Sequence, residues 1–288
     1  MASASRDALQ FPESHRALLE PHLPPRDLEA FSSSRPFTTL TFATSLDSQV
    51  ALAPGVQTAL SGPESKAMTH FLRSRHDAIL IGVNTAVVDN PSLNCRLDGV
   101  GGYGGRGLEG QPRPVIIDPG LRWAFEERQD VGWCKILKLT ERGQGRAPFI
   151  ITAVPRSRIP EEKRGTLESM GGKFISLLPC GMVGENARLL WTHILRALSV
   201  EGLHSVMIEG GAGVINEILS DPDAHRMVDS VILTIAPVWL GEGGVVVTPK
   251  RRHDQKGDQS VPARLECAKW VPLGQDVVLC GRLKQNPN

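Results

Sequence analysis

The stretch SGPESKAMTHFLRSRHDAILIGV, residues 61–83, decides the fold class. Ser61 and Glu64 have the spacing of a capping box, and the apolar residues that follow recur on one face, so the sequence predicts a helix over about 62–75. The apolar run DAILIGV at 77–83 follows almost without a break and predicts a fully buried strand. A helix feeding directly into a buried strand indicates an α/β protein.

The flanking sequence extends this unit in both directions. FTTLTFATS, before the helix, alternates apolar and threonine residues and predicts a first strand, which gives a βαβ unit. Further on, strands and helices alternate until three strand candidates follow one another without a helix between them, which predicts a mixed sheet flanked by helices and finished by three antiparallel strands. The later elements are expected as strands at 114–118, 148–154, 173–178 and 204–209, helices at 187–200 and 211–220, and final strands in VDSVILTIAPVWL, LECAKWV and QDVVLCGRL.

The totals exclude several classes of protein. The chain has 288 residues, 32 basic against 31 acidic, and a formal net charge of +1, so no overall field attracts nucleic acid or an anionic membrane. Its five cysteines are odd in number and form no Cys-x-x-Cys pair, which predicts free thiols and no zinc site. No apolar run approaches the roughly 20 residues of a membrane span, and the first residues lack a signal or transit pattern. We therefore expect a cytoplasmic protein.

Three segments stand apart from the predicted core. Residues 1–34 carry little periodic apolar pattern and predict an N-terminal arm, so the folded domain is expected over 35–288. A glycine-rich insertion at 98–112 resembles a phosphate loop only superficially, because no helix follows it, and it predicts a mobile surface loop. The apolar-poor segment at 248–262 predicts a charged, solvated loop.

The best single clue to function is the run MIEGGAGVINEIL, in which a buried strand passes through a glycine cluster into a helix. Glycines let a ligand approach the backbone, and a helix N-terminus attracts phosphate. The match to a dinucleotide fingerprint is incomplete, since Asn216 stands where the third glycine would be. A purely structural turn between strand and helix remains an alternative for this run.

Several polar residues follow predicted strands, at the edge where open α/β sheets bind ligands. Glu209 ends an apolar strand and must face solvent, a partner or a ligand. Arg73 and Arg96 are two guanidinium groups suited to a phosphate monoester, although each taken alone has the exposure preference of a surface residue. The remaining strand-end candidates are Thr85, Asp89, Asp118, Thr152 and Asn186.

Taken together, these motifs resemble the pyrimidine reductases of riboflavin biosynthesis, in particular the stand-alone fungal and archaeal type. The resemblance covers about residues 35–283 and rests mainly on the block at 61–97, with support from PFTTLTFATSLD, RPVIID, SVMIEGGAGVIN and DVVLC. It implies a dihydrofolate-reductase-like fold, a homodimer, and NADPH as hydride donor. Two positions depart from the family pattern: Ser48 stands where a glycine is common, and Asn84 where a small residue is common.

The resemblance also implies a role for each matching residue. On the cofactor side it places Ala43, Thr85 and Asp89, together with Gly210, Gly211, Ala212, Gly213, Val214, Ile215 and Asn216 around the pyrophosphate. Asp118, Thr152 and Asn186 are added from their positions at strand ends. On the substrate side it places Arg73, Leu93, Arg96 and Glu209, with the arginines on the ribosyl phosphate and Glu209 as the candidate for proton movement.

The implied activity is NADPH-dependent reduction of the ribosyl side chain of 2,5-diamino-6-ribosylamino-4(3H)-pyrimidinone 5′-phosphate to the ribitylamino form. Two alternatives stay open at the level of sequence. One is another NADPH-dependent reductase on the same fold, with a pterin-like or folate-like substrate and no dependence on the two arginines. The other is a catalytically silent nucleotide-binding protein that retains the glycine turn alone.

Overall fold

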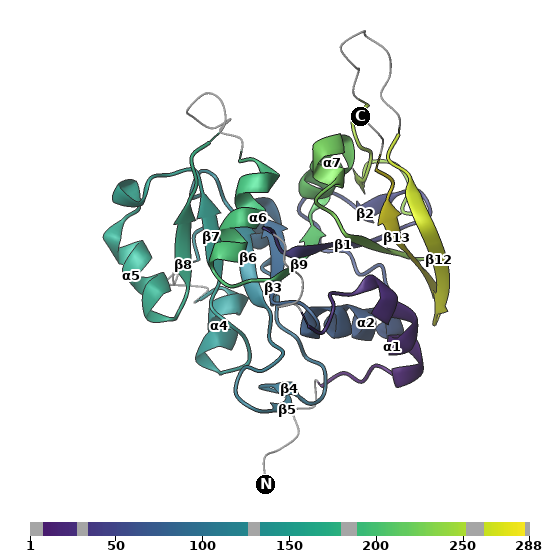
Figure 1. Cartoon of the computed structure of the whole chain (residues 1–288), viewed down its shortest axis with the longest axis horizontal. Helices are drawn as coiled ribbons and strands as arrows, with labels where there is room; N and C mark the ends of the chain where they lie inside the picture. Colours follow the sequence, from purple (N-terminus) through teal and green to yellow (C-terminus); the bar gives the residue numbers. More distant parts are fainter. Residues whose placement is uncertain (1–7, 28–33, 126–132, 180–188, 252–261, 286–288) are drawn as a thin grey trace.

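The computed structural model describes residues 8–27, 34–125, 133–179, 189–251 and 262–285. Its centre is a sheet of nine strands in the order β12-β13-β10-β1-β9-β3-β6-β7-β8, with helices on both faces (Figure 1). The seven strands from β10 to β8 run parallel, and β13 and β12 are antiparallel to their neighbours. The predicted mixed sheet is therefore confirmed. Its strands are β1 (Phe37–Thr44), β3 (Ala78–Gly82), β6 (Arg113–Ile117), β7 (Phe149–Thr152), β8 (Lys173–Ser176), β9 (Ser205–Gly210), β10 (Ser230–Ile235), β12 (Leu265–Leu273) and β13 (Asp276–Leu283).

The βαβ unit predicted from the opening stretch consists of β1, helix α2 (Pro63–Ser74) and β3, but β1 and β3 are not neighbours. Strand β9 pairs in parallel with both of them and lies between them. The helix bounds agree with the sequence, whereas the capping box is wrong. Gly62 is the N-cap residue and no side chain caps the helix, so Ser61 lies one position too early for that role.

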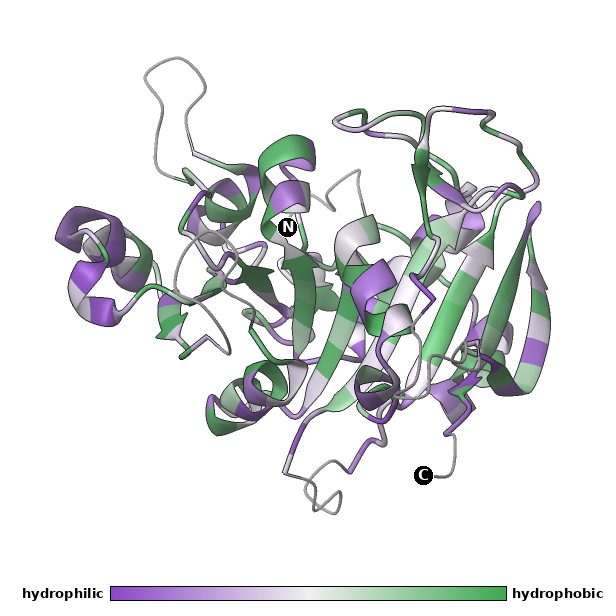
Figure 2. Ribbon diagram, turned by 90° about the horizontal axis from the view of Figure 1, so that it is seen from above, coloured by the Kyte–Doolittle hydropathy of each residue, from purple (hydrophilic) through white to green (hydrophobic). Residues whose placement is uncertain are grey.

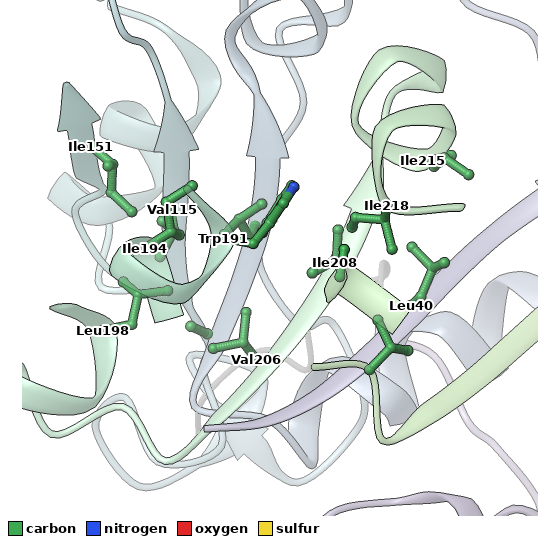
Figure 3. Packing of buried hydrophobic residues seen from close by; sticks show 14 of the residues in the cluster. Leu40, Val115, Ile151, Trp191, Ile194, Leu198, Val206, Ile208, Ile215 and Ile218 are labelled. Atoms are coloured by element: carbon green, nitrogen blue, oxygen red, sulfur yellow. The ribbon is translucent and has the colours of Figure 1, made fainter. Parts of the chain in front are cut away.

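Alternating side chains of the central strands bury two apolar faces, as expected for parallel strands covered on both sides. On one face, α6 (Trp191–Val200) and α7 (Ala212–Ser220) pack over the sheet, and Figure 3 shows Ile194 and Leu198 of α6 near Val115 and Val206. On the other face lie α2 and α4 (Lys135–Glu141). The central strands are predominantly apolar in Figure 2, in line with this burial. Each fully buried aliphatic side chain contributes about 1.5–3 kcal/mol.

Shorter helices and strands connect these elements. They are α1 (Glu13–Leu19), η1 (Glu20–His22), β2 (Gln49–Ala51), α3 (Val83–Asp89), β4 (Val100–Gly101), β5 (Gly104–Gly105), η2 (Arg156–Arg158), α5 (Glu161–Ser169), α8 (Pro222–His225) and β11 (Val245–Val246). Among the helices of the described residues, none has the length and apolar content needed to cross a bilayer.

The described part of the predicted N-terminal arm is packed against the domain. Phe11 and Leu19 are buried in the same cluster as α2, and the Phe11 ring stacks on Phe71 with 5.4 Å between centroids. Residues 8–27 therefore complete the core on the α2 side. The boundary at residue 34 stays a prediction, and most of the predicted charged loop at 248–262 lies outside the described residues.

Ser48 has a left-handed backbone, with φ of 63°. Glycine adopts this region without strain, which accounts for the glycine common at this position of the family pattern. The turn is held by Asp47, whose carboxylate accepts hydrogen bonds from the hydroxyl of Ser45 and from the backbone N–H groups of Leu240 and Gly241. These bonds, led by that of Ser45, keep the pKa of Asp47 below its usual value.

His76, at the end of α2, is buried between the helix and β1. Its Nδ1 lies 2.7 Å from the carbonyl oxygen of Leu72, so Nδ1 carries the proton, and Nε2 accepts from the hydroxyl of Thr39 at 2.8 Å. Burial lowers the pKa of His76 to about 4. A neutral imidazole therefore joins α2 to the sheet.

The lowered pKa of His76 predicts that the folded protein loses stability at acidic pH. Below pH 6.5 the unfolded chain binds a proton at His76 that the folded chain does not bind until about pH 4. We therefore expect the free energy of unfolding to fall across this window by about 1.4 kcal/mol per pH unit from this group. Urea unfolding of His76→Gln and wild type between pH 7 and pH 4 tests this: the variant should lose less stability, and parallel curves would contradict it.

Candidate active site

A cavity with a volume of about 1080 Å³ opens at the carboxyl ends of β1, β3 and β9. This is the edge at which parallel α/β sheets bind ligands. Its wall also includes much of the segment 50–61, one face of α2, the segment from α3 to residue 96, several residues in and after α4, and the N-terminus of α7. Such a volume is at the upper end of small-molecule sites, which accommodates two ligands side by side.

Helix α2 presents a polar face to the cavity at helical spacing. Lys66, Thr69, His70 and Arg73 line the wall, while the opposite side of the helix is buried in the core. The spacing of three and four residues places these side chains in one row. Arg73 was predicted for the site, and the other three were missed, although the same periodicity that predicted the apolar face contains them.

Arg73 forms a two-pronged ion pair with Glu209 of β9. Its Nε donates to Oε1 at 2.8 Å and its Nη2 to Oε2 at 2.7 Å, while Nη1 donates to the carbonyl of Asn94 at 2.9 Å. Burial opposes the charge of Arg73, but the adjacent carboxylate outweighs it and raises the pKa of Arg73 above its ordinary value. This guanidinium is thus paired with Glu209, and its contact with the substrate phosphate stays a prediction.

Arg96 lines the cavity, and no ion pair to it is found among the described residues. Its backbone N–H donates to Nδ1 of His70 at 2.9 Å, which fixes the segment against α2. Burial, together with the nearby charges of Arg73, Arg96 and Lys66, lowers the pKa of His70 to about 2. The imidazole is therefore neutral, and on this side of the cavity the positive charge beside it comes from Arg96 and Lys66, with Lys135 and Arg142 elsewhere in the wall.

The glycine-rich insertion is packed under this site rather than extended as a surface loop. Gln111 is buried and binds both backbone groups of Cys95, with Oε1 accepting from the N–H at 2.8 Å and Nε2 donating to the carbonyl at 2.6 Å. Tyr103 lines the cavity, and its hydroxyl accepts from Nδ2 of Asn94 at 2.8 Å. The close approach requires glycine at Gly101, where a Cβ would lie 2.5 Å from the carbonyl oxygen of Gly107. The expected free surface loop is wrong for these residues.

The N-terminus of α7 faces the cavity through Gly211, Ala212 and Gly213. No side chain caps this nine-residue helix. The backbone N–H of Gly211, the N-cap residue, donates to the hydroxyl oxygen of Thr85 at 3.2 Å. A Cβ on Gly211 would lie 2.7 Å from that oxygen. The arrangement leaves oriented N–H groups beside open space, which suits an anion.

Asp89 ends α3 and also lines the cavity, next to Lys135 of α4. Burial raises the pKa of Asp89, and the charge of Lys135 partly offsets this effect. The sequence analysis assigned no helix or strand to the residues directly after the strand at 77–83. Residues 83–89 instead form a helix that ends at Asn90, whose left-handed backbone precedes Pro91.

The structure brings most of the predicted site residues to this one cavity. Those that line it are Ala43, Arg73, Thr85, Asp89, Arg96, Glu209, Gly211, Ala212, Gly213 and Ile215. Gly210, Val214 and Asn216 belong to the same strand-to-helix turn but do not line the cavity, and Asn186 lies outside the described residues.

Three predicted residues lie elsewhere. Leu93 is buried in the core beneath the site. Asp118 is buried, and its carboxylate accepts from the N–H groups of Arg122 and Trp123 at 2.9 and 2.8 Å, which holds the turn after β6. The hydroxyl of Thr152 donates to the carbonyl of Pro119 at 3.1 Å. Position after a strand was too coarse a signal, because Asp118 binds its own loop and Thr152 binds the loop that follows the neighbouring strand β6.

Comparison with known proteins shows to which family this chain belongs. Residues 36–279 match the family model described as the RibD C-terminal domain. The protein named 2,5-diamino-6-ribosylamino-4(3H)-pyrimidinone 5′-phosphate reductase in Debaryomyces hansenii is 38% identical over 276 residues, covering 94% of this chain and 96% of the relative. The protein of the same name in Eremothecium gossypii is 39% identical over 269 residues, covering 92% and 95%.

Solved structures agree with the fold. The riboflavin biosynthesis reductase Rib7 of Saccharomyces cerevisiae is similar with a TM-score of 0.68 and 32% identity, covering 94% of this chain and 100% of that one. RibD of Acinetobacter baumannii, at 22% identity and a TM-score of 0.65, supports the fold alone. The dihydrofolate-reductase-like architecture expected from the sequence is thus confirmed. With its family match and its reductase relatives, the chain belongs to the RibD C-terminal domain family of oxidoreductases.

Proposed function

We propose that this protein reduces the ribosyl side chain of 2,5-diamino-6-ribosylamino-4(3H)-pyrimidinone 5′-phosphate to the ribitylamino form with NADPH. One observation carries the proposal: a single cavity joins an uncapped helix N-terminus on one wall to Arg96 and Lys66 on another. The first suits the pyrophosphate of a dinucleotide, and the second suits the phosphate of a sugar. The names of the yeast relatives specify this reaction for those proteins.

The residues present fit a nicotinamide dinucleotide. At Gly213 a Cβ would meet no atom within 4 Å, so the backbone at the start of α7 is open to a ligand. Gly211 to Gly213 would hold the pyrophosphate, and Thr85, Asp89 and Ala43 would line the remainder of the cofactor site. When bound, the nicotinamide supplies a hydride to the substrate.

The protein's own part is to position the substrate and to move protons. Ring opening breaks the C1′–O4′ bond, places a proton on O4′ and forms an imine at C1′. Reduction then adds a hydride at C1′ and a proton at the nitrogen. Glu209 carries the proton to O4′, and Arg73 holds the carboxylate in place through two hydrogen bonds. Arg96 and Lys66 anchor the phosphate, which fixes C1′ within the cavity.

The direct test is NADPH oxidation, followed by absorbance, with the diamino substrate. We expect a product heavier by two hydrogen atoms, with deuterium at C1′ when the transferred hydrogen of NADPH is labelled. Oxidation with a folate or pterin but not with this substrate would identify a different reductase. Binding of NADPH without oxidation by any of them would overturn the proposed activity.

The cofactor site predicts a specific effect of Gly211→Ala. The added Cβ would lie 2.7 Å from Oγ1 of Thr85 and would displace the hydrogen bond between the two residues. We expect the Kd for NADPH, measured by fluorescence titration, to rise about tenfold or more. Gly165→Ala in α5, where a Cβ meets no atom within 4 Å, is the matched control. Equal Kd values for the two variants would argue against this cofactor site.

We also propose that the protein forms a homodimer whose interface includes β12, the strand at one edge of the sheet. Strand β12 is an edge strand, and Trp270 on it is 61% exposed. An unpaired edge with an exposed aromatic residue favours association. In light scattering after size exclusion, Trp270→Glu should shift the protein toward the monomer mass. Val200→Glu, at a position on α6 that is 79% exposed, should leave the mass unchanged. A monomeric wild type would refute the dimer.

A cytoplasmic location is proposed on the cysteine pattern. The four cysteines within the described residues are free thiols, and two of them, Cys95 and Cys280, are buried. Free thiols are typical of reducing compartments. Fractionation of cells that express the tagged protein tests this location.

A further inference from the structure

A second cavity, of about 640 Å³, lies at the opposite edge of the sheet from the active site. It opens where β3, β6, β7 and β9 begin, whereas the catalytic cavity lies where β3 and β9 end. Four arginine side chains contribute to its wall: Arg26, Arg75, Arg113 and Arg146. For a chain with a net charge of +1, this is a strong local concentration of positive charge.

Two of these arginines, Arg26 and Arg75, share one carboxylate, that of Glu20. Oε1 of Glu20 accepts from Nε of Arg26 at 3.2 Å, and its Oε2 accepts from Nη1 of Arg75 at 2.5 Å. The two acidic residues in the cavity wall are also occupied. Oδ2 of Asp77 accepts from the N–H groups of His204 and Ser205, each at 2.9 Å, and Glu201 pairs with Lys173 at 2.6 Å. Asp77 keeps its charge, but within the described residues neither Asp77 nor Glu201 forms a salt bridge with the other two arginines.

Arg113 and Arg146 are held rigidly without a counter-charge. Nη1 of Arg113 donates to the carbonyls of Ala147 and Gly171 at 2.7 and 3.0 Å, and its guanidinium lies 4.5 Å from the centre of the Phe149 ring. Nε of Arg146 donates to the carbonyl of Gln111 at 2.8 Å, and Nη2 to that of Leu108 at 3.2 Å. Across the described ranges, neither guanidinium has a carboxylate within salt-bridge distance. Both are therefore fixed donors with N–H groups to spare.

The electrostatics of the pair support this interpretation. The two guanidinium groups line the same cavity, and Arg113 donates to the carbonyl of Ala147, the residue after Arg146. In line with this placement, burial, followed by the charge of Arg146, lowers the pKa of Arg113 to about 10. His76, also in the wall, is neutral because its pKa is lowered to about 4. Juxtaposed guanidinium groups with fixed geometry bind phosphate through paired, charge-assisted hydrogen bonds. An anion between them would relieve their repulsion.

We propose that this second cavity binds a small phosphorylated molecule, with Arg113 and Arg146 holding its phosphate group. The volume exceeds that of a phosphate ion and falls in the range of small-molecule sites, so the ligand is a phosphate ester rather than the free ion. The site is separate from the catalytic cavity, since the two share none of their lining residues. Its occupancy does not depend on the proposed reductase activity.

The test uses tungstate as a probe for a phosphate-type oxyanion. Crystals of the full chain soaked in sodium tungstate should show an anomalous peak within hydrogen-bond distance of both guanidinium groups. In solution, calorimetry with inorganic phosphate on the Arg96→Gln variant, which lacks the arginine anchor of the active site, should still detect a site that does not depend on Arg96. Adding Arg113→Gln or Arg146→Gln to that variant should weaken this site about tenfold or more.

Two controls separate specific binding from a general loss of charge or fold. Arg282→Gln removes the same charge from an exposed position on β13 and should leave the affinity unchanged. Arg113→Lys keeps the charge but loses the paired N–H donors of the guanidinium group. We expect it to bind phosphate weakly and to have a melting temperature close to that of the wild type. A tungstate peak in the catalytic cavity alone would overturn the proposal, and so would equal weakening by Arg282→Gln.

Discussion

Glu209→Gln is expected to lower kcat/KM for the diamino substrate by about 10²–10³ and the free energy of unfolding by about 2–4 kcal/mol. Glutamine keeps the shape of the side chain but removes the charge opposite Arg73. The two side chains are 18% and 13% exposed, so the variant leaves a largely buried guanidinium without its counter-ion. Steady-state kinetics and urea unfolding at pH 7 measure the two effects.

Two further variants keep this prediction specific. Arg73→Lys retains the charge but only part of the two-pronged contact, and should fall between wild type and Glu209→Gln in activity. Glu266→Gln removes an exposed carboxylate from β12 and should change neither quantity. If Glu209→Gln lost stability but kept full activity, Glu209 would be a structural residue and its role in proton movement would be wrong.

Arg96→Gln is expected to raise KM for the phosphorylated substrate by about ten- to a hundredfold, since charge-assisted hydrogen bonds to a phosphate are worth about 1.5–3 kcal/mol each. Arg96 lines the cavity without a salt bridge to any carboxylate of the described residues, whereas Arg73 is paired with Glu209. Removing the phosphate from the substrate should abolish the difference, so wild type and variant should handle the free riboside equally poorly.

Arg106→Gln is the matched control for Arg96→Gln. Arg106 is exposed in the glycine-rich insertion and does not line the cavity, so its loss should leave KM unchanged. Lys66→Gln should raise KM less than Arg96→Gln, because Lys66 is exposed to solvent that screens its charge. An unchanged KM in Arg96→Gln would contradict the assignment of the phosphate to this arginine.

Local patterns in the sequence were sufficient to predict the elements of the sheet. The apolar run before Gly82 and the spacing along α2 each specify one element, because burial and helical periodicity act over a few residues. The short helix α3 was missed because its two exposed valines and the following Asn90-Pro91 resemble turn or strand chemistry.

Those local patterns could not predict contacts between residues that are far apart in the sequence. The partner of Arg73 is 136 positions away in sequence, so the local argument assigned its charge to a ligand. In the same way, no motif indicated that Gln111 would clamp Cys95, and glycine content alone suggested mobility. The capping box failed for a different reason: spacing identifies a cap only when the first helical residue is known.

The placement of β9 between β1 and β3 has a consequence for synthesis on the ribosome. The first 200 residues contain both outer strands of this trio but not the one that joins them, so the centre of the sheet cannot close until residues 205–210 have emerged. Glu209 belongs to that segment, and the turn into α7 follows it directly, so both are synthesised at the same stage. A nascent chain arrested before this point would expose unpaired strand edges to chaperones and to aggregation, and would have no ligand site to stabilise it.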